Sequence, residues 1–174
     1  MTARDLPTPP AFTALEAWAG PGRVVRAAEP DLAAWRLPRP QKASLVSSGV
    51  PVLEGVVDVV SFAAEPTGYR LAGRDPGTTY AAEPGTGRVL ERASGGTRLV
   101  NSSIDHWLCS LHLVGTWLAG STAIHQWDED AAMEERALAE LADLVERIAR
   151  LDPAARGDDH RTHFWPAVLD RWLY

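Results

Sequence analysis

Residues 83–118 read EPGTGRVLERASGGTRLVNSSIDHWLCSLHLVGTWL, and this stretch decides the fold. Glycine-rich turns at 84–87 and 94–96 separate short runs of strand-forming residues. Such turns between short runs are typical of antiparallel strand pairs. The last run passes directly into a polar cap and a long helix with an apolar face. The stretch describes a folding unit, and it contains no activated nucleophile, phosphate-binding loop or metal cage.

Polar residues predict where the helix begins. Ser102 and Asp105 have the spacing of a capping box, and a carboxylate at that position also suits the helix dipole. We assign roles in caps and turns to Gly87, Asn101, Ser102 and Asp105. After the cap, apolar residues recur at helical spacing on one face: Ile104, Trp107, Leu108, Leu111, Gly115 and Leu118.

The chain before residue 83 adds further short strands. From Val56 onward, β-prone runs are separated by turn sequences at 66–68 and 75–77. We expect four or five short antiparallel strands between Val56 and Val100. With the helices on either side, this pattern predicts an α+β fold.

Prolines mark residues 1–10 as an extended lead-in, and we expect one domain over 11–174. Spacing and turn residues predict a helix over 12–18, a short strand at 24–25, a few helical turns over 31–37 and a helix over 41–48.

Two more helices are predicted after Gly120. Asp128, Glu129 and Asp130 place acids at the positive end of the first helix, and Asp152-Pro153 ends it. Its expected buried stripe is Met133, Ala137, Leu138, Leu141, Leu144, Val145, Ile148 and Leu151. A short terminal helix is expected over 164–173.

Composition narrows the classes of function. The net charge of −6 argues against nucleic acid as a partner, since phosphate binding needs a basic face, and it favours a basic protein. Cys109 is the only cysteine, no apolar run is long enough to cross a membrane, and residues 1–10 lack a signal-peptide core. We therefore expect a cytoplasmic protein with no membrane contact.

Histidine and cysteine are grouped in two places. His106, Cys109 and His112 recur every three residues, but successive steps of three drift around a helix and aim the ligands poorly at one metal. Asp159, His160 and His163 form a second group in a polar stretch. We expect no metal or cofactor, and a small metal-dependent enzyme using the second group is the least favoured alternative.

Several of these motifs occur in an order that resembles the SUKH superfamily, and the SUKH-4 branch in particular. The matching segments are Gly49-Val50-Pro51, Tyr69-Arg70-Leu71-Ala72-Gly73, the turn and strand over 84–89, Val100-Asn101-Ser102-Ser103, Leu151-Asp152-Pro153-Ala154-Ala155 and Phe164-Trp165-Pro166-Ala167-Val168-Leu169. The resemblance covers the chain from about residue 22 onward. It implies a small, strongly curved antiparallel sheet of four to six strands packed against helices.

The resemblance also implies a function without catalysis. Many members are immunity proteins that bind and block a toxin of a polymorphic toxin system, often a nuclease or deaminase, and others are regulatory adaptors. No catalytic residues come with the family. For the partner surface we expect Trp127, which lies off the periodic stripes, with Asp128, Glu129 and Asp130. The partner's identity stays open, and so does self-association into a homodimer.

Overall fold

A five-stranded antiparallel sheet forms the base of the molecule. The computed structural model describes residues 6–75, 77–156 and 162–172. Its strands follow one another as a meander in the order β3-β4-β5-β6-β7. They are β3 (Val59–Glu65), β4 (Gly68–Gly73), β5 (Thr79–Ala82), β6 (Val89–Ala93) and β7 (Gly96–Asn101). The predicted α+β class and number of antiparallel strands are confirmed.

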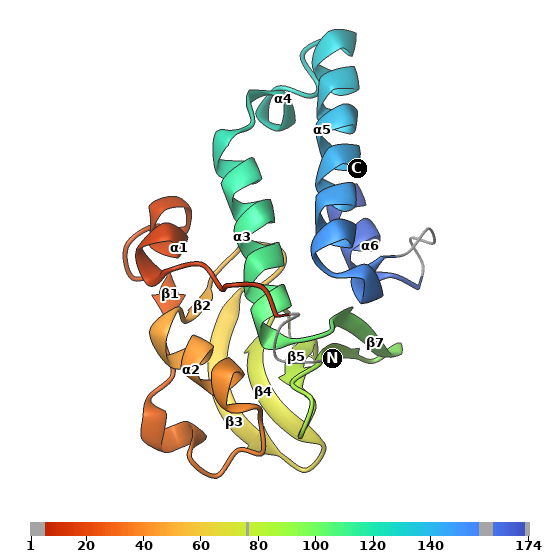
Figure 1. Ribbon diagram of the computed structural model, residues 1–174. Helices are drawn as coiled ribbons and strands as arrows, with labels where there is room; N and C mark the ends of the chain where they lie inside the picture. Colours follow the sequence, from red (N-terminus) through yellow and green to blue (C-terminus); the bar gives the residue numbers. More distant parts are fainter. Residues whose placement is uncertain (1–5, 76, 157–161, 173–174) are drawn as a thin grey trace.

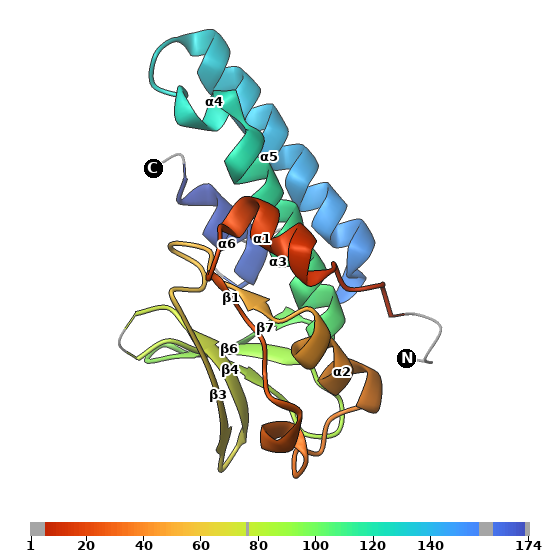
Figure 2. The same cartoon turned by 90° about the vertical axis from the view of Figure 1, so that its left-hand side faces the viewer.

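Tight turns and irregular pairing shape this sheet. Glu65 pairs with Gly68 and Ala93 pairs with Gly96 at the ends of two hairpins. The register shifts within the β3–β4, β4–β5 and β6–β7 pairs. Such irregularities bend a strand and increase its twist, and Figure 2 shows β3 and β4 bending as they leave the helices.

The N-terminal part adds a small second sheet and three short helices. These elements are α1 (Phe12–Ala19), β1 (Val24–Val25), the 3-10 helix η1 (Glu29–Leu32), α2 (Arg39–Ser47) and β2 (Val50–Pro51). β1 pairs antiparallel with β2. The helical turns expected over 31–37 begin earlier, in η1, because Pro30 in its first turn favours helical backbone there. One further turn follows, in which the Trp35 N–H donates to the Leu32 carbonyl at 3.0 Å.

The C-terminal helices rise from the sheet. They are α3 (Ile104–Gly120), α4 (Thr122–His125), α5 (Ala131–Leu151), the 3-10 helix η2 (Pro153–Ala155) and α6 (Phe164–Asp170). α3 and α5 run side by side, and α4 joins them at the end far from the sheet (Figure 1). The short α4 was not predicted, because four residues are too few to show a period.

Tyr80 joins the sheet to this helical layer. Its side chain is fully buried, and its ring centroid lies 5.9 Å from that of Trp107 in α3 and 5.7 Å from that of Phe164 in α6. Offset and edge-on aromatic pairs stabilise a core beyond the area that they bury. Burial raises the pKa of the Tyr80 hydroxyl far above its usual range, with the nearby Glu91 carboxylate as the second cause.

The start of α3 differs from the prediction by one residue. Ser103, not Ser102, is the N-cap, and its hydroxyl oxygen accepts a hydrogen bond from the His106 backbone N–H at 3.1 Å. Gln41 of α2 provides a second cap, since its side-chain oxygen accepts from the Ile104 N–H at 2.9 Å. The same amide donates to the Thr86 carbonyl at 3.0 Å. α2 therefore holds both the β5–β6 turn and the start of α3.

Gly87 lies beside this Gln41 contact. Its φ of +73° is left-handed backbone, which favours glycine. A Cβ at this position would also overlap the Gln41 side chain. The predicted turn residue thus provides both the turn and the space for the cap of α3.

A buried carboxylate, Asp152, connects three elements. It is 1% exposed and accepts from the Asn101 side-chain amide at 2.9 Å, the Ser102 N–H at 2.8 Å and the Ser102 hydroxyl at 2.8 Å. Asn101 in turn accepts from the Trp165 indole N–H at 3.1 Å. We call Asn101, Ser102, Asp152 and Trp165 the Asp152 network. It ties the end of β7 to the end of α5 and to α6.

No helix in the described ranges 6–75, 77–156 and 162–172 is long and apolar enough to cross a membrane.

Asp152→Ala is expected to lower the free energy of unfolding by about 3 kcal/mol or more, because the Asn101 amide, the Ser102 N–H and hydroxyl and the Ala154 N–H all lose their acceptor. Urea denaturation followed by circular dichroism measures the change. Asp143→Ala is the matched control: it removes the same carboxylate from α5, the helix that Asp152 caps, but Asp143 is exposed, so a change within about 0.5 kcal/mol is expected. Equal losses in the two variants would contradict the assigned role.

Asp105→Asn is expected to raise stability at pH 7 by about 1 kcal/mol. Asp105 is buried, and burial raises its pKa above the usual 3.8. The folded carboxyl therefore binds its proton more tightly than the unfolded one, so the wild type loses stability as pH rises from 3.8 through the folded pKa. Urea titrations from about pH 4 to pH 7 should show the gain of the variant growing over that window. A gain independent of pH, or a loss at pH 7, would contradict this account, and the exposed Glu54→Gln is the control.

Candidate partner-binding surface

The loop between α4 and α5 forms the tip of the helical layer. Residues 126–130 lie there, at the end of α3 and α5 that points away from the sheet (Figures 1 and 2). Because α5 contains 21 residues, it spans about 30 Å at 1.5 Å per residue. We call the loop 126–130 and the first turns of α5 the acidic tip.

Local hydrogen bonds hold the shape of this loop. The Glu129 N–H donates to the Gln126 carbonyl at 3.0 Å. Asp130 is the N-cap of α5, and its carboxylate accepts from the Met133 N–H at 2.8 Å. Asp128, Glu129 and Asp130 are all exposed. Of the three acids predicted to lie on the partner surface, Asp130 therefore has a structural role as the cap of α5, while Asp128 and Glu129 are exposed.

Trp127 is half-buried and packs against the hydrophobic core. The predicted partner residues Trp127, Asp128, Glu129 and Asp130 thus lie together in one loop, and the indole is held by the core on one side. A large side chain that is already held in place loses little conformational entropy on binding. This arrangement suits an anchor residue at an interface.

Glu140 of α5 binds the end of α3 and the start of α4 through hydrogen bonds. Its carboxylate accepts from the Ser121 hydroxyl and, at 3.1 Å, from the Trp117 indole N–H. Ser121 is the N-cap of α4 and accepts from the Ile124 N–H at 3.1 Å. The hydrogen bond from Ser121 is the largest cause that holds the pKa of Glu140 below its usual value. The tip is therefore supported by polar contacts as well as by packing.

The acidic charge of the chain is concentrated here. Eight Asp and Glu and three Arg stand between residues 126 and 151, so this segment carries five of the six net negative charges of the chain. Glu134 and Glu135 in the first turns of α5 are exposed beside the loop. A field of one sign on a protruding helix speeds association with a surface of opposite charge.

Leu138 was wrongly predicted to be buried. It is 45% exposed, while the buried stripe of α5 is Ala137, Leu141, Leu144 and Ile148. Each residue turns a helix by about 100°, so a residue at the edge of an apolar stripe can point away from the packed face of the helix. Leu138 follows Glu134 and Glu135 by one turn and adds an apolar group to the acidic tip.

The grouped histidines and the cysteine have structural contacts. The His106 ring lies 2.7 Å from the Ser103 hydroxyl, and the His112 ring accepts from the Trp18 indole N–H at 3.0 Å. Burial raises the pKa of the Cys109 thiol to about 11, so it carries little thiolate at neutral pH. Trp18 also covers Gly115, where a Cβ would overlap its ring, and this contact docks α1 on α3.

Asp159 and His160 lie outside the described residues. His163 is described, directly before α6, with its ring 2.9 Å from the Thr162 hydroxyl. Within residues 6–75, 77–156 and 162–172, no group of three His, Cys, Asp or Glu is placed to hold a metal ion.

Comparison with known proteins identifies a family. A family model described as SUKH-4 immunity protein matches residues 10–171, which is nearly the whole chain. No curated protein and no solved structure matches the chain.

In the Glu140→Ala variant, α4 is expected to unfold locally more often than in the wild type. The variant leaves Ser121 and Trp117 without their acceptor, and the hydrogen-exchange protection factor of the Ile124 N–H should fall on the order of tenfold, with a smaller change in global stability. Because the folded pKa of Glu140 is lowered, its contribution is present above the unfolded value of 4.5 and is lost as pH falls below it.

Wild-type protection at Ile124 should therefore decrease on acidification, and protection in the variant should not. Glu146→Ala, an exposed change on the same helix, is the control. Protection that stays at the wild-type level in Glu140→Ala would contradict the role given to this carboxylate.

Proposed function

We propose, since this chain belongs to the SUKH-4 immunity protein family, that it binds a toxin protein and blocks it without catalysing a reaction. The family match over residues 10–171 carries the proposal. The acidic tip supports it, because a protruding, negatively charged surface with an anchored Trp has the properties of a protein-binding site.

The proposed mechanism is steric and electrostatic occlusion. Asp128 and Glu129 are exposed and would attract a basic surface, which raises the rate of encounter. The half-buried Trp127 and the exposed Leu138 would then supply the apolar contacts that slow dissociation. Binding over a substrate channel would exclude the substrate.

The charge of the tip indicates a partner class. A nuclease has a basic surface for its phosphate-bearing substrate, and an acidic inhibitor would imitate that substrate. A deaminase toxin that acts on nucleic acid would present a similar surface. We therefore propose a nuclease-type or deaminase-type toxin as the partner, and a cytoplasmic location for the complex.

Binding to an endogenous protein, as a regulatory adaptor, is the alternative within the same fold. Mass spectrometry of proteins retained by the chain from lysate and culture filtrate separates the two. Recovery of a toxin domain whose activity the chain inhibits in vitro supports the immunity function. Recovery of a housekeeping protein, with no inhibited toxin, favours the adaptor.

Trp127→Ala combined with Asp128→Ala is expected to weaken partner binding on the order of 30-fold, about 2 kcal/mol, if the acidic tip is the contact. Titration calorimetry measures the affinity. Glu129→Lys keeps the indole in place and should act mainly by slowing association, most strongly at low salt. Asp130 stays unchanged in every variant because it caps α5.

Glu54→Lys is the matched charge control, since Glu54 is an exposed acid outside the tip. Unchanged affinity in the Trp127 and Asp128 double variant would remove the tip from the interface. The inhibition assay would still decide the immunity function independently.

A further inference from the structure

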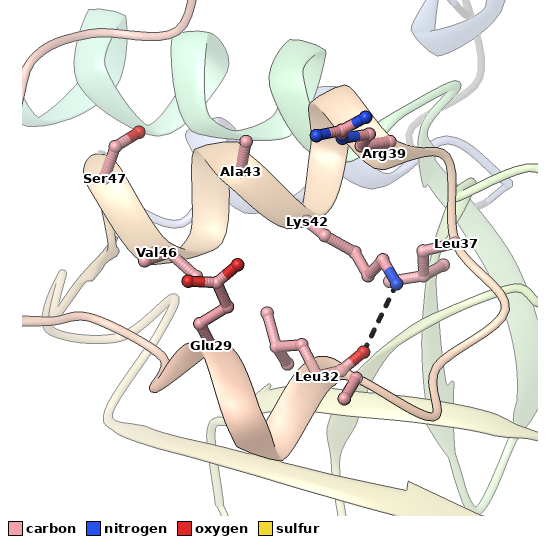
Figure 3. Close-up of a pocket in the computed structure, with 9 residues that line it drawn as sticks. Glu29, Leu32, Leu37, Arg39, Lys42, Ala43, Val46 and Ser47 are labelled. Carbon is pink, nitrogen blue, oxygen red and sulfur yellow. Dashed lines mark hydrogen bonds between the residues drawn. The ribbon is translucent and has the colours of Figure 1, made fainter.

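We draw no further inference here: the strongest candidate, the groove between η1 and α2 that Leu32, Lys42 and Val46 line (Figure 3), carries none, because the Lys42 ammonium already donates to the Leu32 and Trp35 carbonyls and nothing in the structure shows what covers the groove.

Discussion

The buried carboxylate of Asp152 is the constraint on which the arrangement of the helical layer depends. A polar side chain that is 1% exposed is costly to bury unless protein donors replace the water that it loses. Asn101 and Ser102 supply those donors from the point where β7 ends and α3 is about to begin. The requirement to satisfy the hydrogen bonds of one buried carboxyl group therefore places the end of α5 against the junction of β7 and α3. The Trp165 indole N–H of α6 donates to the Asn101 side-chain oxygen, so the same network also holds α6.

The consequence for function is a separation between the parts that hold the fold and the parts that face a partner. The Asp152 network and the Tyr80 aromatic cluster lie at the sheet end of α3 and α5. The acidic tip lies at the other end of the same helices, where Glu140 and the cap of α4 hold it. α5 runs without interruption from Ala131 to Leu151 and so connects the tip to the sheet end of the helical layer. A tip that is ordered before binding would suit the proposed contact with a partner.

Local sequence patterns predicted most helices and strands, but they were less accurate for the ends of helices and for the limits of a buried helix face. The helix after Val100 was predicted from its apolar spacing, but the cap moved from Ser102 to Ser103. Either of the two adjacent serines could cap the helix with its hydroxyl. Ser102 donates its N–H and hydroxyl to Asp152, and Ser103 is the N-cap that accepts from the His106 N–H. Asp152 was predicted only to end a helix. Leu138 was placed on the wrong face because periodicity gives the centre of a stripe but not how wide a neighbouring helix covers it.

The sequence by itself determined the α+β class, the short antiparallel strands with tight turns, the family and the segment that carries most of the net charge. These follow from periods of two and of about 3.6 residues, from turn chemistry and from counted charges, all of which are local along the chain. Only the tertiary structure decided that Asp152 meets Asn101 across a sequence separation of 51 residues and that Gln41 caps α3. Such contacts depend on the packing of distant segments, and no period in the sequence records which buried polar group will satisfy which other.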